Sequence, residues 1–154
     1  MNELSIREQI LRAIAVALGG DGSPAAAVFR SRLDQIRSDG DESALPCFDI
    51  SPGKERDDPD AADHDAWGRL LSVDVRAIVD GTGHEYGDGA LDPMYLFAVR
   101  SMMCDETFGG LAISTEWTGT DEPVFLPEGR DIIGLTINFD VKFAVKRGDP
   151  AEKG

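Results

Sequence analysis

The sequence predicts an α+β fold, with a mostly antiparallel sheet of about four to five strands and two helices packed on one of its faces. Apolar residues recur at helical spacing in residues 6–18 and 91–104. They alternate with polar residues, as in half-buried strands, in residues 71–80 and 133–146. The segments follow in the order helix, two short strands, long strand, helix, strand and long strand. A chain of 154 residues suits one hydrophobic core, so we expect one domain over residues 1–148 and a flexible C-terminal end at 149–154.

The first helix is predicted by its start and stop signals as well as by its spacing. Ser5-Ile6-Arg7-Glu8 is a capping box, in which Ser5 accepts from the backbone N–H of Glu8 and Glu8 reaches back to Ser5. Gly19-Gly20 supplies a stop, and a turn-rich break follows up to Pro24. One face carries the apolar positions Ile6, Ile10, Ala13, Ile14, Ala17 and Leu18.

Two short strands and a loop are predicted next. Ala27–Arg30 is a short apolar run, which favours an edge strand. Leu45–Ile50 favours a second strand, and Pro46 places it at an edge or at a strand start because proline cannot donate to a ladder. Ser51–Asp65 is rich in proline, glycine and acidic residues, which predicts a solvated loop.

The two long strands have the clearest pattern in the chain. Their strict alternation predicts one buried face each, and residues 111–117 give a weaker third member. The polar faces carry Asp74, Arg76, Asp140 and Lys142, which can form cross-strand ion pairs if the strands are neighbours. The positions expected inside are Leu71, Val73, Val75, Ala77 and Val79, then Ile133, Leu135, Ile137, Phe139, Val141, Phe143 and Val145.

A second helix is predicted over residues 91–104. Asp92 can cap it, and Pro93 suits the first helical position. We expect its apolar stripe to consist of Tyr95, Val99 and Met102, flanked by Leu96 and Met103. These residues, together with Phe97, are interpreted as core rather than as part of a cofactor site.

Composition and charge exclude several kinds of partner. The net charge of −14 repels phosphate backbones, so sequence-specific nucleic-acid binding is not expected. No segment approaches the roughly 20 apolar residues of a membrane span, so we expect no membrane partner. Met1–Ser5 has no basic segment leading into an apolar run, and we therefore expect no secretory signal. Cys47 and Cys104 lack Cys-x-x-Cys spacing and are expected to be half-buried reduced thiols.

No catalytic, cofactor-binding or metal site is predicted. His64 and His84 stand beside carboxylates, but neither has a second histidine three or four residues away, so we expect both to be solvated. Asp57–Asp65 offers oxygens for calcium without the order of an EF-hand. Gly81–Gly87 resembles a phosphate loop only in its glycine count, and we interpret it as a long turn. The Gly-x-Ser-x-Gly elbow of a serine nucleophile is missing, and no carboxylate pair among the 29 acidic residues is singled out for glycoside chemistry.

Taken as a whole, the order of segments resembles the phage tail terminator family, the lambda-like minor tail proteins that cap the tail tube. The resemblance covers most of the chain through several short motifs, while residues 51–66 contain no motif to match. The matching stretches are Ser5-Ile6-Arg7-Glu8-Gln9-Ile10, Val28-Phe29-Arg30-Ser31-Arg32, Leu45-Pro46, Thr107-Phe108-Gly109-Gly110-Leu111 and the closing strand that runs to Gly148-Asp149-Pro150.

The resemblance implies a structural protein and not an enzyme. Such proteins form a ring, typically a hexamer, that terminates tail-tube polymerisation and provides the surface on which the head docks. The implied partners are other copies of the chain, the tail tube protein and a head-completion protein. The implied location is the host cytoplasm during assembly and then the virion tail. Six copies would carry a charge of about −84, which would keep phosphates off the wall of a DNA channel.

Two alternatives remain open on the sequence. The first is a head-completion or connector protein of the same assembly class. The second is an unrelated small enzyme domain that binds a metal or another ligand through the loop histidines. A defined ring would favour the assembly roles, whereas a bound metal or a deep polar pocket would favour the enzyme.

Overall fold

The computed structural model describes residues 3–31, 45–61, 63–125 and 131–154. It confirms the α+β class, with two α-helices and a mostly antiparallel sheet, but the described residues form seven strands rather than four to five. The helices are α1 (Ile6–Leu18) and α3 (Asp92–Cys104), and the 3-10 turns are η2 (Pro59–Ala61) and η3 (Gly87–Leu91). The strands are β1 (Ala27–Arg30), β2 (Cys47–Asp57), β3 (Ala66–Asp80), β4 (Ser114–Thr120), β5 (Val124–Phe125), β6 (Ile132–Lys146) and β7 (Asp149–Lys153).

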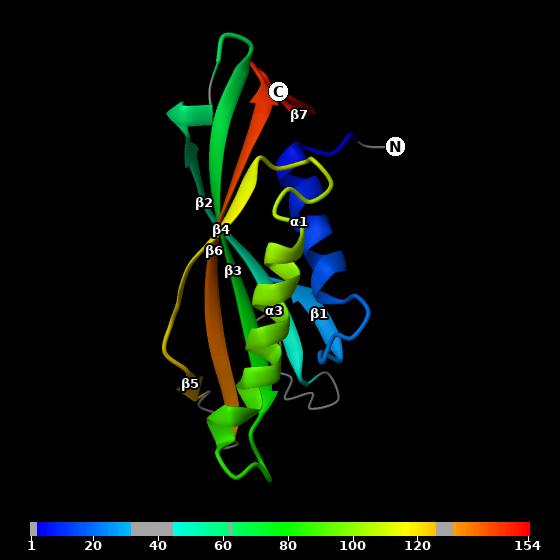
Figure 1. The fold of residues 1–154 in the computed structure, drawn as a ribbon, viewed down its shortest axis with the longest axis vertical. Helices are drawn as coiled ribbons and strands as arrows, with labels where there is room; N and C mark the ends of the chain where they lie inside the picture. The colour runs from blue at the N-terminus through cyan, green and yellow to red at the C-terminus, as the bar shows by residue number, and fades with distance from the viewer. Residues whose placement is uncertain (1–2, 32–44, 62, 126–130) are drawn as a thin grey trace.

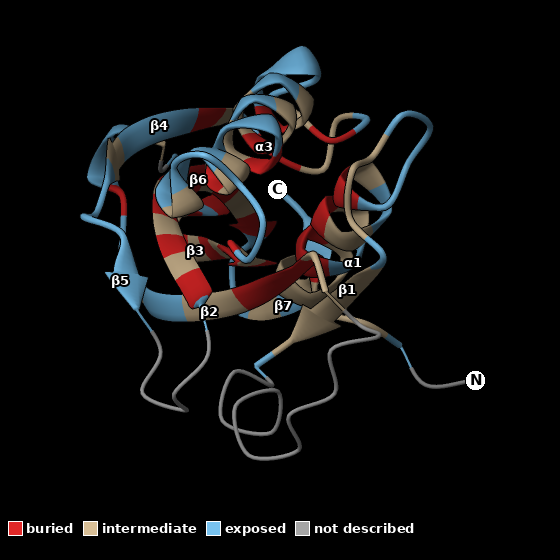
Figure 2. Ribbon diagram, turned by 90° about the horizontal axis from the view of Figure 1, so that it is seen from below, coloured by how far each residue is buried: buried red, intermediate tan, exposed pale blue. Residues whose placement is uncertain are grey.

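The centre of the sheet is the antiparallel pair of β3 and β6. They stay in register over their whole length, from Ala66 opposite Lys146 to Asp80 opposite Ile132. The sheet order is β1-β2-β3-β6-β4, in which only β1 and β2 run parallel, and β5 and β7 also pair with β6. Both helices lie on one side of the sheet (Figure 1), and the sheet curves around them (Figure 2).

The core lies between this face of the sheet and the two helices. Every position expected inside on β3 and β6 is buried, and α1 adds Ile6, Ile10, Leu11, Ile14 and Leu18. Ile78 points to the other face and is buried there beside Cys47 and Ile132. The period-two pattern therefore predicted the inward face of both long strands correctly. Among the described residues, no helix is long and apolar enough to cross a membrane.

The α1 boundaries agree with the predicted signals. Ser5 caps the helix, with its Oγ accepting from the backbone N–H of Glu8 at 3.1 Å, and Gly19 ends it. The Glu8 carboxylate, predicted to reach back to Ser5, binds two arginines. It accepts from Arg30 at 2.6 and 3.2 Å and from Arg12 at 3.1 Å, and so fastens α1 to β1.

This ion pair makes part of the stability dependent on pH. The hydrogen bond from Arg30 holds the pKa of Glu8 below its usual value. A depressed carboxyl pKa contributes stability above the unfolded pKa, and the contribution is lost as the pH falls through the folded value. We therefore expect the free energy of unfolding of the wild type to fall more between about pH 5 and pH 3 than that of Glu8→Gln. Urea titrations of both proteins at several pH values would measure this, and parallel curves would contradict it.

The acidic segment 51–65 is not the solvated loop that the sequence predicts. β2 continues through it to Asp57 and pairs with β3, with a break in register between Pro52 and Glu55. An irregularity of this kind tolerates a proline, which has no N–H to give to the ladder. Arg69 of β3 neutralises the strand end, because it binds both Glu55, at 2.8 Å, and Asp57. η2 then turns the chain into β3.

Two further expectations are corrected at α3 and at the C-terminus. The buried stripe of α3 is Met94, Ala98 and Met102, whereas Tyr95 is half-buried and Leu96 is 41% exposed. The predicted stripe starts at Tyr95 and the observed one at Met94. Because successive residues of a helix are about 100° apart, a shift of one residue points the predicted face in a different direction. The N-cap of α3 is Leu91 and not Asp92, which is the first residue of the helix. Residues 149–153 are not a free end but strand β7, which folds back on β6 through a turn at Gly148 with φ of 80°.

Candidate functional site

The two histidines cannot share one metal ion. His64 precedes β3 and His84 follows it, so a strand of 15 residues separates them, which corresponds to about 50 Å at 3.3 Å per residue. His64 is exposed. Within the described ranges, no group of three or more histidine, cysteine or acidic side chains is placed to hold a metal.

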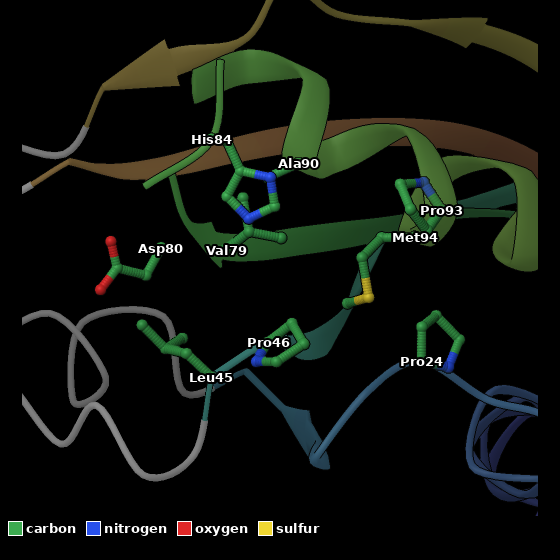
Figure 3. Close-up of a pocket in the computed structure, with 9 residues that line it drawn as sticks. All are labelled: Pro24, Leu45, Pro46, Val79, Asp80, His84, Ala90, Pro93 and Met94. Carbon is green, nitrogen blue, oxygen red and sulfur yellow. The ribbon is translucent and has the colours of Figure 1, made fainter. Parts of the chain in front are cut away.

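His84 borders a cleft at the end of β3 (Figure 3). The cleft has a volume of about 420 Å³. The imidazole of His84 lies over Val79, while the carboxylate of Asp80 points away from the imidazole (Figure 3). Asp80 accepts from the backbone N–H of Thr82 at 2.9 Å, which fixes the start of the turn. The lining residues are Pro24, Leu45, Pro46, Val79, Asp80, His84, Ala90, Pro93 and Met94.

The chemistry open to this cleft is limited. None of these nine described lining residues is a serine, threonine, cysteine or lysine, so the lining offers no hydroxyl, thiol or amine nucleophile for His84 to activate. Three of the nine are prolines, which have no side-chain polar atom and no backbone N–H. The arrangement is that of a partly apolar cleft lined also by an imidazole and a carboxylate, those of His84 and Asp80.

Neither cysteine is among the described residues that line this cleft. Cys47 is fully buried and Cys104 is exposed at the end of α3, and both are free thiols. Burial, helped by the nearby Asp49 carboxylate, raises the pKa of Cys47 to about 12. Cys47 therefore stays protonated at neutral pH and is a poor nucleophile.

The uncovered face of the sheet carries a network of ion pairs and hydrogen bonds. The four charged residues expected to pair with one another lie on neighbouring strands, but each has a different partner. Arg76 lies 3.7 Å from Asp49, Lys142 lies 3.5 Å from Glu116, and Arg56 reaches Asp140 at 3.6 Å. Burial raises the pKa of Asp74, whose carboxylate accepts a 3.4 Å hydrogen bond from Asn138. These contacts join adjacent strands on the face of the sheet that points away from α1 and α3, which is a structural role.

A different surface has the character of a binding site. A groove of about 580 Å³, here called the acidic groove, lies between the start of α3 and the β4–β5 connection. Tyr86 stands at the groove with 70% of its surface exposed. Tyr95 also lines the groove, and its ring contacts the ring of Trp117 edge-on, at 5.8 Å between centroids. The lining residues are Tyr86, Asp88, Gly89, Leu91, Asp92, Tyr95, Thr120, Pro123 and Leu135.

Exposed apolar side chains gather on the same part of the chain. Among the described residues, nine large apolar side chains are exposed, and seven of them lie between residues 86 and 125: Tyr86, Leu96, Met103, Ile113, Trp117, Val124 and Phe125. This segment also carries seven acidic residues and one basic residue, Arg100, which gives a net charge of −6. The acidic residues are Asp88, Asp92, Asp105, Glu106, Glu116, Asp121 and Glu122. Apolar side chains grouped at one exposed place are typical of protein interaction surfaces, and Tyr86, Tyr95 and Pro123 lie together at this groove.

Part of this surface was misassigned on the sequence. Tyr95, interpreted as core, packs against the core and also lines the groove, and Trp117 of the weaker third strand is 44% exposed. The sequence does contain one signal of exposed apolar residues, the pair Val124-Phe125. This pair follows Asp121-Glu122-Pro123 and is not part of an alternating apolar pattern, which would indicate a buried strand face. In the structure these two residues are 59% and 65% exposed.

Comparison of the chain with protein-family models and with curated proteins found no match. The stretches on which the expected resemblance rests fall on α1, on β1, just before β2, on the α3–β4 connection and on the β6–β7 hairpin, and Arg32 lies outside the described residues. In the α3–β4 connection, Asp105 accepts from Thr107 and from the backbone N–H of Gly109. Phe108, Gly109 and Gly110 all have positive φ there. This stretch therefore forms a compact turn that sets where β4 begins.

The geometry around the histidines leads to a direct prediction. The variant in which His64 and His84 are both alanine should keep the wild-type free energy of unfolding within about 1 kcal/mol and should keep its state of association. The reason is that both are loop residues and neither is among the buried core residues. Chemical denaturation and light scattering measure the two properties. Zinc or iron bound one to one after exhaustive dialysis of the wild type, and lost in the variant, would contradict it.

Proposed function

We propose that this chain is a structural tail protein of a phage or prophage, a tail terminator whose ring stops growth of the tail tube and provides the surface for head docking. The observation that carries the proposal is the acidic, apolar surface of residues 86–125. A surface of this kind supports a role in assembly because apolar side chains gathered outside a core gain free energy when a partner covers them. The terminator-like order of segments supports this particular assembly.

The charge of the chain is consistent with this role. At −14 per subunit, copies repel one another and stay dispersed until screening or a partner lowers the repulsion. The same charge disfavours contact with phosphates, as a ring through which DNA moves requires. The proposed partners are further copies of the chain, the tail tube protein and a head-completion protein. The proposed locations are the host cytoplasm during assembly and then the virion tail.

Association should therefore depend on ionic strength. We expect the protein to be largely monomeric in low salt and to form rings, most simply hexamers, as salt or magnesium is added. The Debye length falls from about 30 Å at 0.01 M to about 10 Å at 0.1 M, which screens repulsion between neighbouring subunits. Light scattering across protein, salt and magnesium concentrations would measure the mass. Addition of the protein to growing tail tubes should stop their elongation.

Several results would count against the proposal. Monomers or dimers under all conditions, together with tubes that neither bind the protein nor stop growing, would exclude a terminator. Binding to purified heads but not to tubes would favour the head-completion alternative. DNA retarded by the protein at physiological salt would contradict a channel wall that repels phosphate.

The cleft beside His84 favours a second candidate, a small enzyme domain that binds a ligand. It predicts that a small molecule or a metal stabilises the monomer and that the His84→Ala variant loses this stabilisation. A thermal-shift screen with divalent metals and small organic acids separates the two candidates, because a terminator needs no such ligand.

A further inference from the structure

Two exposed surfaces of different character lie on opposite flanks of the molecule. In both Figure 1 and Figure 2, α1 lies on one side of the sheet's long axis and β5 lies on the other. The acidic groove lies beside the β4–β5 connection and so belongs to the β5 flank. Because they face in opposite directions, these two flanks can meet only between different copies of the chain.

The α1 flank presents an apolar side chain beside positive charge. Val16 is 75% exposed, and it is one of only two large exposed apolar residues outside the 86–125 segment, counted over the described residues. Arg12 lies one helical turn before it, on the same face, with 62% of its side chain exposed. Arg12 and Arg30 both bind the single carboxylate of Glu8, so this cluster has an excess positive charge of one.

The β5 flank presents the complementary features. Tyr86, Tyr95 and Pro123 form apolar walls of the acidic groove, and the carboxylates of Asp88 and Asp92 lie among them. The groove is open to solvent, and its volume of about 580 Å³ exceeds that of a single valine side chain several-fold. A helix can lay an apolar residue and a neighbouring cation into a groove of this kind.

We propose that α1 of one copy docks in the acidic groove of the next, with Val16 against the tyrosine walls and Arg12 toward the groove's carboxylates. The proposal deepens the proposed function and rests on the chain forming a ring. A contact between two different flanks leaves each copy with one flank free for a further neighbour. Such a heterologous contact repeats in one direction and closes into a ring when its rotation permits.

The positive charge beside Val16 complements the two carboxylates that line the groove, so a second copy can occupy it although the whole chain is acidic. Residues 3–31 hold Arg7, Arg12 and Arg30 against Glu3, Glu8 and Asp21, so this flank is neutral in a chain of net charge −14. The 86–125 segment has a net charge of −6. Pairing these two flanks therefore avoids bringing two acidic surfaces together, while the remaining charge of the chain opposes association until salt screens it.

The decisive experiment uses two full-length variants and their mixture. Val16→Asp should block the α1 flank, and Tyr86→Asp should block the groove, because each places an unpaired carboxylate in the contact. Each variant alone should associate at least about 30-fold more weakly than the wild type, the loss expected for a central interface residue. In an equimolar mixture, each variant still has one intact flank. The mixture should therefore form a one-to-one dimer and no ring.

Trp67→Ala is the matched control, because Trp67 is 46% exposed but lies at the opposite end of β3 from the groove. It should form rings as the wild type does, and circular dichroism should show all three variants folded. Rings formed by Val16→Asp or Tyr86→Asp with wild-type affinity, or a mixture that forms no dimer, would overturn this interface. Because wild-type rings and tube capping are measured in the same series, that result would leave the terminator function standing. A wild type that never associates and never caps tubes would overturn both.

Discussion

Replacing Phe139 with alanine is expected to lower the free energy of unfolding by about 3–5 kcal/mol. Phe139 lies at the middle of β6 and is 1% exposed, on the face that packs against the helices. Truncation removes most of a buried ring and leaves a cavity between two long strands, whose paired backbones limit how far the site can collapse. Urea or guanidinium denaturation followed by circular dichroism measures the loss.

The control comes from the opposite face of the same strand. Lys142 is 33% exposed and lies 3.5 Å from Glu116, so Lys142→Ala removes only a surface ion pair. Its expected cost is under about 1 kcal/mol. Equal losses in the two variants would show that the inward face of β6 is assigned wrongly.

The long strands and α1 could be predicted from the sequence because each is determined by local, redundant signals. In β6 the apolar residues occupy every second position from Ile133 to Val145, and a shift of one residue would expose all of them. In α1 the cap at Ser5, the apolar face and the stop at Gly19 agree with one another. Where several local signals agree, contacts with distant parts of the chain are not needed to predict the secondary structure.

The errors arose where a distant partner decides the local structure. The second half of β2 has the composition of a loop, and it is a strand because its backbone pairs with β3, where Arg69 also binds Glu55 and Asp57. The end of the chain is a strand because β6 extends far enough to pair with it. In α3 the small Ala98 faces the core, although the larger neighbours gave the stronger apolar signal.

The acidic groove could not be predicted for a related reason. Its walls come from η3, from α3, from the β4–β5 connection and from Leu135 of β6, which are separate in the sequence. No spacing rule connects Tyr86 with Pro123, since each reads as an ordinary loop residue. The acidity of the region was visible in the sequence, but the apolar surface within it depends on the fold.

The corner between β2 and β3 is the second place where a single substitution should have a large effect. Gly68 packs against η2 so closely that an added Cβ would overlap the carbonyl oxygen of Asp58 and would approach the Cβ of Ala61 to 2.8 Å. The backbone N–H of Asp58 donates to the carbonyl of Gly68 at 2.9 Å, so the two segments are tied where they touch. A side chain at this position must push the η2 backbone away and break that hydrogen bond.

Gly68→Val is therefore expected to lower the free energy of unfolding by about 3 kcal/mol, from overpacking together with the lost hydrogen bond. Gly119 of β4 provides the comparison, because a Cβ added there meets nothing within 4 Å. Gly119→Ala should change stability by less than about 0.5 kcal/mol. Chemical denaturation of both variants measures the difference. If Gly68→Val proved as stable as Gly119→Ala, the close contact between η2 and β3 would not exist, and the acidic segment would be the free loop that its composition suggests.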